Sequence, residues 1–282
     1  MIEPLDWVAC DIDRDVLERE LRALADHLDV TLTPMAALGD SPDDASLLVQ
    51  ALRNSVISHA ERLVQSFMPA VVVLRLSLTV GDRQLEGIFL RQRISPGLPA
   101  LWLLLDSVTN LFAFLEGLPG VLDMTPDAVL GYGIFFANEA VVGDEGPFAA
   151  FPDFASLPPS ARGAAERDLS KLREIVASRP DDSSPEELND GALQTRALGH
   201  IEAALAGSEP KGFSHLTYDP DEDDYCFDIF FVYSATLYAA TIRVNRKTGQ
   251  PTMTGDAPLA SVGPDATDGQ ARQTSRLPFL FG

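Results

Sequence analysis

The longest stretch without a charged residue, Ile229 to Ile242, most constrains the fold of this chain. It lies within 225–253, where aromatic and β-branched residues typical of a half-buried strand are concentrated. From Tyr238 to Asn245 apolar and polar side chains alternate with a period of two, which predicts a strand with one buried face. The segment 246–249 predicts a turn, because Gly249 tolerates a positive φ. We therefore expect two long antiparallel strands and a short third strand that ends near Met253.

Helical spacing of apolar residues predicts two helices near the N-terminus. Asp11 or Asp13 caps the first helix, which ends near Leu28 and buries a stripe of leucines. The second begins at 41–44, where the order Ser-Pro-Asp-Asp is a strong start signal, and ends before Pro69. Alternating apolar segments then predict a three-stranded antiparallel meander, with strands at 70–80, 84–94 and 100–106.

Two apolar segments, 108–115 and 128–142, fit a buried helix or a buried strand, and periodicity does not separate the two. We predict helices for both. Pro126 after Thr125 favours a helix start, whereas Gly131 and Gly133 disfavour a helix interior. Further along the chain we expect a short extended piece at 148–151 and helices at 160–178 and 184–206, the last interrupted or kinked near Gly191.

These elements predict an α+β fold in which antiparallel meanders pack against helices. A loose stretch at 152–162, rich in Pro and Ser, divides the chain into an N-terminal half, 1–157, and a C-terminal half, 158–260. The remaining residues, 261–282, are expected to form a disordered tail with an apolar tip at 277–281. Each half reads as two helices, the second opened by Ser-Pro-acid-acid, and then strands. Two similar ααβββ halves from an internal duplication are therefore a hypothesis.

The net charge of −21 is the unusual feature of the composition. A chain this acidic repels phosphate backbones and anionic membrane surfaces, so binding to nucleic acid or to a membrane is not expected. A basic protein partner, a cation, or simple solubility remain open. Cys10 and Cys226 show no metal-ligand spacing and no disulfide framework. Without a signal-peptide pattern or a long apolar run, the sequence predicts a soluble cytoplasmic protein whose oligomeric state is open.

The acidic run 219–224 begins like a calcium-binding EF-hand loop. The match then fails, because Asp224 occupies the glycine position and Phe230 the position of the closing glutamate. A solvated acidic loop before a strand is the favoured interpretation, and no metal or other cofactor is predicted.

Other motifs are incomplete. Lys247-Thr248-Gly249 and Ser208-Glu209-Pro210-Lys211 match two β-lactamase signatures formally, but Pro210 disrupts the helical turn that the chemistry needs. Gly131-Tyr132-Gly133 is half of a dinucleotide fingerprint, and His200-Ile201-Glu202 is half of a zinc-deaminase motif. No complete catalytic motif is present, so the sequence favours a protein that is not an enzyme.

Two hypotheses on function follow. The first is a non-catalytic module of bacterial type whose acidic surface holds a basic protein, as an immunity protein or antitoxin masks a toxin. The second is an enzyme or small-ligand receptor with a pocket between the C-terminal strands and helices, lined by Tyr225, Phe231, Tyr233 and Tyr238, with Asp228 as a polar contact. For Asp228 we favour a solvent-facing position on an edge strand. The candidate binding residues are Asp219, Asp221, Asp223, Asp224, Asp228, Tyr233, Tyr238, Asp144 and Glu145.

Overall fold

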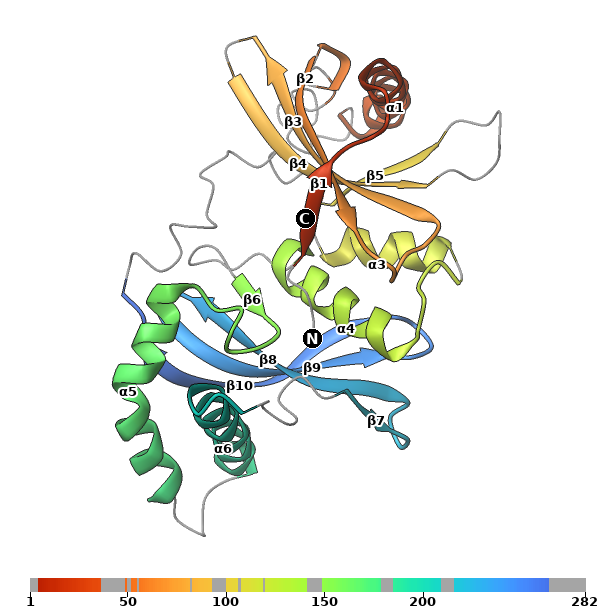
Figure 1. Ribbon diagram of the computed structural model, residues 1–282. Helices are drawn as coiled ribbons and strands as arrows, with labels where there is room; N and C mark the ends of the chain where they lie inside the picture. The colour runs from red at the N-terminus through yellow and green to blue at the C-terminus, as the bar shows by residue number, and fades with distance from the viewer. Residues whose placement is uncertain are drawn as a thin grey trace. The chain divides into compact units, whose positions relative to one another are not determined.

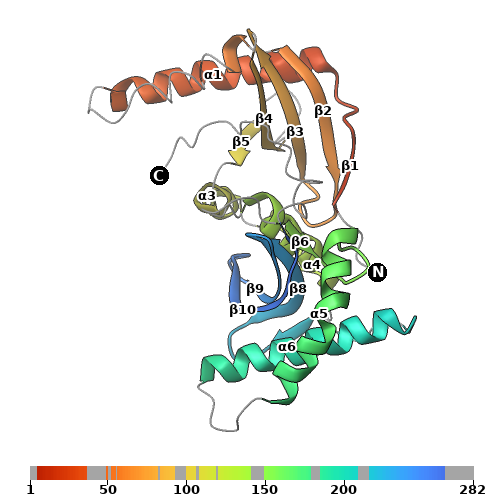
Figure 2. The same ribbon diagram turned by 90° about the vertical axis from the view of Figure 1, so that its left-hand side faces the viewer.

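The structure is a computed structural model. It describes residues 5–36, 49, 52–54, 56–81, 83–92, 100–105, 108–118, 120–140, 149–178, 185–208 and 216–263. These residues form an α+β fold with two five-stranded antiparallel sheets (Figures 1 and 2). Each sheet belongs to its own compact unit: the N-terminal unit spans Asp6–Leu122, and the C-terminal unit begins at Asp123.

The sheet of the N-terminal unit is a meander in which each strand pairs with the next along the chain. Its strands are β1 (Asp6–Ala9), β2 (Val56–Val64), β3 (Val71–Val80), β4 (Arg83–Gln92) and β5 (Leu101–Leu105). The predicted three-stranded meander is confirmed as β3, β4 and β5. Gly81, at a φ of +63°, makes the predicted turn between β3 and β4.

Helix α1 (Arg14–Ala36) covers one face of this sheet. The predicted leucine stripe is confirmed, because Leu17 and Leu21 are fully buried against Leu74 and Leu76 of β3. The predicted cap is also present, since the Asp13 carboxylate accepts the main-chain N–H of Asp15 at 2.8 Å. The helix continues beyond the predicted end near Leu28 and reaches Ala36.

The second predicted helix is wrong over its C-terminal half, because Val56–Val64 is strand β2. Between α1 and β2 the described residues are Val49 and 52–54, and all four are helical. Leu52 and Leu63 are buried, as the helical spacing required. Val56, which the same spacing placed inward, is 56% exposed, and Ile57 is buried instead. As a strand, this segment pairs with β3, so the main-chain N–H and C=O groups along one edge of β3 find partners. The free energy of that pairing exceeds the local preference for a helix. Helix α3 (Val108–Gly117) then follows β5 and confirms the first of the two ambiguous apolar helices.

The sheet of the C-terminal unit has the order β10-β9-β8-β6, and β7 pairs with the first residues of β8. Its strands are β6 (Ala149–Phe151), β7 (Thr217–Asp219), β8 (Asp224–Tyr233), β9 (Thr236–Asn245) and β10 (Pro251–Ser261). The two long strands are confirmed as β8 and β9, and Gly249 turns the chain at a φ of +69°. The third strand, β10, has 11 residues and is not short. Two register shifts, at Met253/Gly255 and Pro258/Ala260, accommodate the glycine and proline that are typical of loops.

Helices cover both faces of this sheet (Figure 1). One face packs against α5 (Pro159–Ala177) and α6 (Pro185–Leu205), which contribute Leu172, Ala197 and Ile201 to the core. The other face packs against α4 (Pro126–Phe135), which continues as a π-helix, η1 (Phe136–Ala140). Predicted helices at all three places are confirmed. Helix α6 is continuous through Gly191, so an interruption there, one of the two predicted alternatives, is wrong.

Segment 123–157, which the sequence analysis assigned to the N-terminal half, belongs to the C-terminal unit because β6 pairs with β8. At the other end, Ser261 lies in β10 and Val262 is buried, so the expected tail does not begin at 261. Residues 264–282 lie outside the described residues. The two units share a class but not a strand order. Duplication remains a hypothesis.

Candidate functional site

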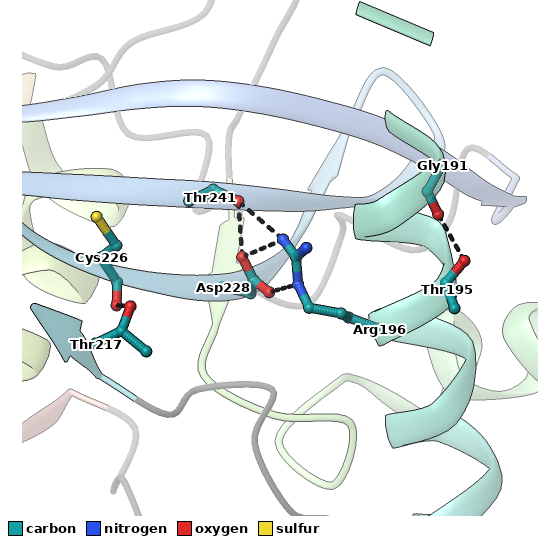
Figure 3. A network of polar contacts seen from close by, with 7 residues as sticks. All are labelled: Gly191, Thr195, Arg196, Thr217, Cys226, Asp228 and Thr241. Atoms are coloured by element: carbon teal, nitrogen blue, oxygen red, sulfur yellow. Dashed lines mark hydrogen bonds and ion pairs between the residues drawn. The ribbon is translucent and has the colours of Figure 1, made fainter. Parts of the chain in front are cut away.

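The side chain of Asp228 lies at the centre of a polar network under α6 (Figure 3). Arg196 of α6 donates from Nε to Asp228 Oδ2 at 2.5 Å and from Nη2 to Oδ1 at 3.1 Å. The hydroxyl of Thr241, on the neighbouring strand β9, donates to the same Oδ1 at 2.7 Å. Both carboxylate oxygens are therefore bonded, and this set of partners makes burial of the charge tolerable.

The predicted position of Asp228 is wrong. β8 pairs with β9 along its whole length, and its other edge carries β6 and β7, so Asp228 is on an interior strand and is buried. Its side chain points toward the helices because it shares a face with Phe230 and Val232, which belong to the core under α5 and α6. The sequence around Asp228 does not show which helix supplies the arginine that pairs with it.

The aromatic residues of the hypothetical pocket lie on the opposite face. Tyr225, Phe231 and Tyr233 alternate with Asp228 along β8, and Tyr238 pairs with Phe231 across the strands. The rings of Phe231 and Tyr238 stack with centroids 4.8 Å apart and an interplanar angle of 7°. The sheet therefore separates these aromatic side chains from Asp228, and a single pocket does not contain both.

The acidic run forms the turn of a hairpin between β7 and β8, which we call the acidic hairpin (217–226). Figure 1 shows it at one end of the C-terminal sheet. Its inner carboxylates are paired with cations from β9 and the following turn. Arg243 Nη1 lies 3.2 Å from Asp219 and 3.9 Å from Asp224, and Lys247 Nζ lies 3.2 Å from Asp223. Asp221 and Glu222, at the tip of the turn, are exposed.

Tyr218 is part of the same hairpin. Its hydroxyl donates to Asp223 Oδ1 at 2.8 Å, its ring lies 5.7 Å from that of Tyr225, and Arg246 lies 5.8 Å above it. The bond from Tyr218 and the nearby Lys247 lower the pKa of Asp223, and the same bond raises the pKa of the Tyr218 phenol. Asp223 has a φ of 57°, a conformation that Asp tolerates better than most residues. These contacts hold the turn in one geometry.

These pairings disfavour a calcium site in the acidic run, because Asp219, Asp223 and Asp224 already have arginine or lysine partners. Within the described ranges, no group of three or more His, Cys, Asp or Glu side chains is arranged to hold a metal ion.

The other sequence motifs have structural roles where they are described. His200 is buried, accepts the main-chain N–H of Phe154 at Nε2 over 3.2 Å, and packs on Phe230, whereas Glu202 pairs with Arg173. Burial lowers the pKa of His200.

Gly131-Tyr132-Gly133 lies inside α4, where Gly133 touches the Phe227 ring and leaves no room for a Cβ. Lys247-Thr248-Gly249 is a turn in which Asn245 Oδ1 accepts the N–H groups of Lys247 and Thr248. Asp144, Glu145, Lys211 and the apolar tip 277–281 lie outside the described residues.

Sequence reasoning missed Arg196, Thr241 and Tyr218. Arg196 precedes Ala197 in the buried register of α6, and a buried aspartate on a facing strand requires such a cation. That requirement was the available signal, but it did not identify which arginine would supply the charge.

Comparison of this chain with protein-family models, with curated proteins and with solved structures gives no match. None of the described helices is long and apolar enough to cross a membrane.

Proposed function

We propose that this protein is a non-catalytic, cytoplasmic protein-binding module that holds a basic protein partner, as an immunity protein or antitoxin masks a toxin. The acidic hairpin is the observation that supports this proposal most. Its inner carboxylates are fixed by Arg243, Arg246 and Lys247, while Asp221 and Glu222 stay exposed at its tip. A rigid acidic turn needs little ordering when it binds, which favours affinity.

The net charge of −21 adds a long-range attraction for basic partners and a repulsion of phosphate backbones. Nucleic acid and anionic membranes are therefore disfavoured as partners. The contacts of Asp228 fit an anchor between helix and sheet better than a catalytic base, because Arg196 and Thr241 occupy both of its oxygens.

A pull-down from the native host at low and moderate salt tests the proposal. The double variant Asp221→Lys/Glu222→Lys reverses both exposed charges of the hairpin tip. The control variant Glu166→Lys/Glu174→Lys changes the net charge by the same amount at exposed positions of α5 in the same unit.

We expect the wild type and the control to retain a basic protein that elutes as salt rises, and the hairpin variant to retain about tenfold less. Retention of no protein at either salt would refute the proposal. Equal losses in the two variants would assign the binding to net charge alone and remove the hairpin from it.

A further inference from the structure

The two outer edges of the C-terminal sheet differ. β10 carries Pro251 and Pro258, which lack a main-chain N–H, and its pairing with β9 shifts register twice. Prolines and bulges of this kind prevent a further strand from pairing with an edge. β7, with the sequence Thr-Tyr-Asp at 217–219, contains no proline, and its pairing with β8 has no register shift.

The register shows which way the main chain of β7 points. A two-residue turn at Ser234–Ala235 joins Tyr233 to Thr236, so these two residues form a hydrogen-bonded pair. The odd-numbered residues of β8 therefore bond to β9, and the even-numbered residues point to the opposite edge.

The arrangement of β6 agrees with this assignment. Asn138 bonds both the N–H and the C=O of Ala150, so Ala150 points away from β8 and its neighbours bond to Phe230 and Val232. On the same edge, Cys226 and Asp224 bond to Thr217 and Asp219. The N–H and C=O of Tyr218, between them, consequently point outward.

No residue in the part of the chain that the structure describes pairs with this outer edge of β7. The Tyr218 side chain beside it is 45% exposed. The acidic turn follows immediately, with Asp221 and Glu222 exposed. The edge therefore combines an outward donor and acceptor, an exposed aromatic ring and negative charge.

We infer, resting on the function proposed above, that β7 accepts an extended basic segment of the partner protein as an added strand. The N–H and C=O of Tyr218 form the main-chain hydrogen bonds with that segment, and its lysines or arginines lie beside the carboxylates of the acidic hairpin. Strand addition to a sheet edge obtains affinity from main-chain bonds and specificity from side chains. Because β7 is short, charge supplies most of the attraction, and binding weakens steeply with salt.

A short peptide of alternating lysine and valine serves as the probe, and its glutamate–valine counterpart serves as the control. Amide hydrogen exchange is followed by NMR on the full chain. At a peptide concentration ten times Kd, we expect the lysine–valine peptide to slow exchange of the Tyr218 amide by about tenfold. The amides of β10 should keep their rates, and the glutamate–valine peptide should have no effect.

Two variants separate the main chain of Tyr218 from its ring. Tyr218→Ala removes the ring and its hydroxyl bond to Asp223 but keeps the main-chain N–H. Tyr218→Pro removes the same side chain and also the outward N–H, without removing a hydrogen bond to β8. We expect the lysine–valine peptide to bind Tyr218→Pro about fivefold more weakly than Tyr218→Ala, the loss typical of one hydrogen bond. Exchange in the wild type remains a valid test if the proline variant folds poorly.

One result would overturn strand addition alone. In that result the peptide binds, and Asp221→Lys/Glu222→Lys weakens its binding, but the Tyr218 amide exchanges as fast as in the free protein. The acidic surface and the proposed function would then stand without strand addition. Absence of peptide binding also overturns strand addition, and the pull-down then decides the proposed function separately.

Discussion

In each unit an arginine–carboxylate pair joins a helix to the sheet, and the two pairs have opposite polarity. In the N-terminal unit the sheet supplies Arg91, on β4, and helix α1 supplies Glu20. In the C-terminal unit the sheet supplies Asp228 and helix α6 supplies Arg196. Each pair also receives a third bond from the adjacent strand, from the Trp102 indole N–H in one unit and from the Thr241 hydroxyl in the other.

The pairs differ in how far their charges are removed from water. The side chains of Arg91 and Glu20 are 7% and 20% exposed, and two bonds of 2.8 Å join them. Asp228 is 9% exposed, but Arg196 is 45% exposed. The Glu20 carboxylate raises the pKa of Arg91, so Arg91 stays charged. Loss of Arg91 therefore leaves the Glu20 carboxylate largely shielded from water, whereas Arg196 can be hydrated when it loses its partner.

Removing Arg91 should have the largest effect. Arg91→Leu leaves the Glu20 carboxylate without its cation, and we expect the free energy of unfolding of the N-terminal unit to fall by about 3 kcal/mol. Urea unfolding followed by tryptophan fluorescence measures this unit alone, because the chain has two tryptophans, Trp7 and Trp102, and both lie there. The double variant with Glu20→Leu should recover most of the loss, since no buried charge is then left alone. A double variant as unstable as Arg91→Leu would contradict this account.

On the other face of the C-terminal sheet, helix α4 packs closely on the ring of Phe227. Gly133→Ala places a methyl group against the Phe227 ring, and we expect the free energy of unfolding of the C-terminal unit to fall by about 2 kcal/mol. The five tyrosines all lie in the C-terminal unit, so tyrosine absorbance during urea unfolding measures it. Gly199→Ala is the matched control in α6, where a Cβ meets no atom. It should raise the free energy of unfolding of the C-terminal unit by about 0.5–1 kcal/mol, because alanine favours a helix more than glycine does. Stabilisation by both substitutions would refute the packing argument.

Asp228→Asn tests the second pair directly. The amide loses the charge that Arg196 contacts but still accepts the Thr241 hydroxyl, and the exposed guanidinium regains water. We therefore expect a loss of about 1–2 kcal/mol, again measured by tyrosine absorbance. A loss equal to that of Arg91→Leu would break the comparison between the units.

The smallest effect is a difference in acid sensitivity. Burial lowers the pKa of His200, so on acidification the unfolded chain binds a proton before the folded C-terminal unit does. Stability of this unit should fall as pH drops below about 6.5, by at most about 1.4 kcal/mol per pH unit, until folded His200 is protonated too.

Unfolding followed by tyrosine absorbance between neutral and mildly acidic pH tests this expectation. His200→Gln, whose Oε1 can accept the Phe154 N–H, should remove this slope. Tryptophan fluorescence, which reports on the N-terminal unit, should give the same unfolding curve for the wild type and His200→Gln. Equal slopes in the wild type and His200→Gln would exclude His200 as the cause.

Local signals in the sequence were sufficient for much of the fold. The charge-free run, the period-two alternation and Gly249 predicted β8, β9 and the turn after them, and proline at the helix start marked α4 and α6. The candidate site was harder to predict. Composition predicted the acidic run as a solvated loop but did not predict β7. The pairing of the carboxylates with Arg243 and Lys247 depends on strand register, which a run of carboxylates does not encode.

The sequence by itself determined the α+β class and most strands and helices, because hydrophobic periodicity and turn residues act over a few neighbouring positions. The tertiary structure alone decided that Val56–Val64 is a strand, that Asp228 is buried, and that Gly133 touches Phe227. Each of these depends on a partner distant in the chain: the open edge of β3, Arg196 and the packed face of the sheet. At these positions the local sequence preference is weak. Leaving a strand edge unpaired or a buried charge without a partner costs more free energy than that preference contributes.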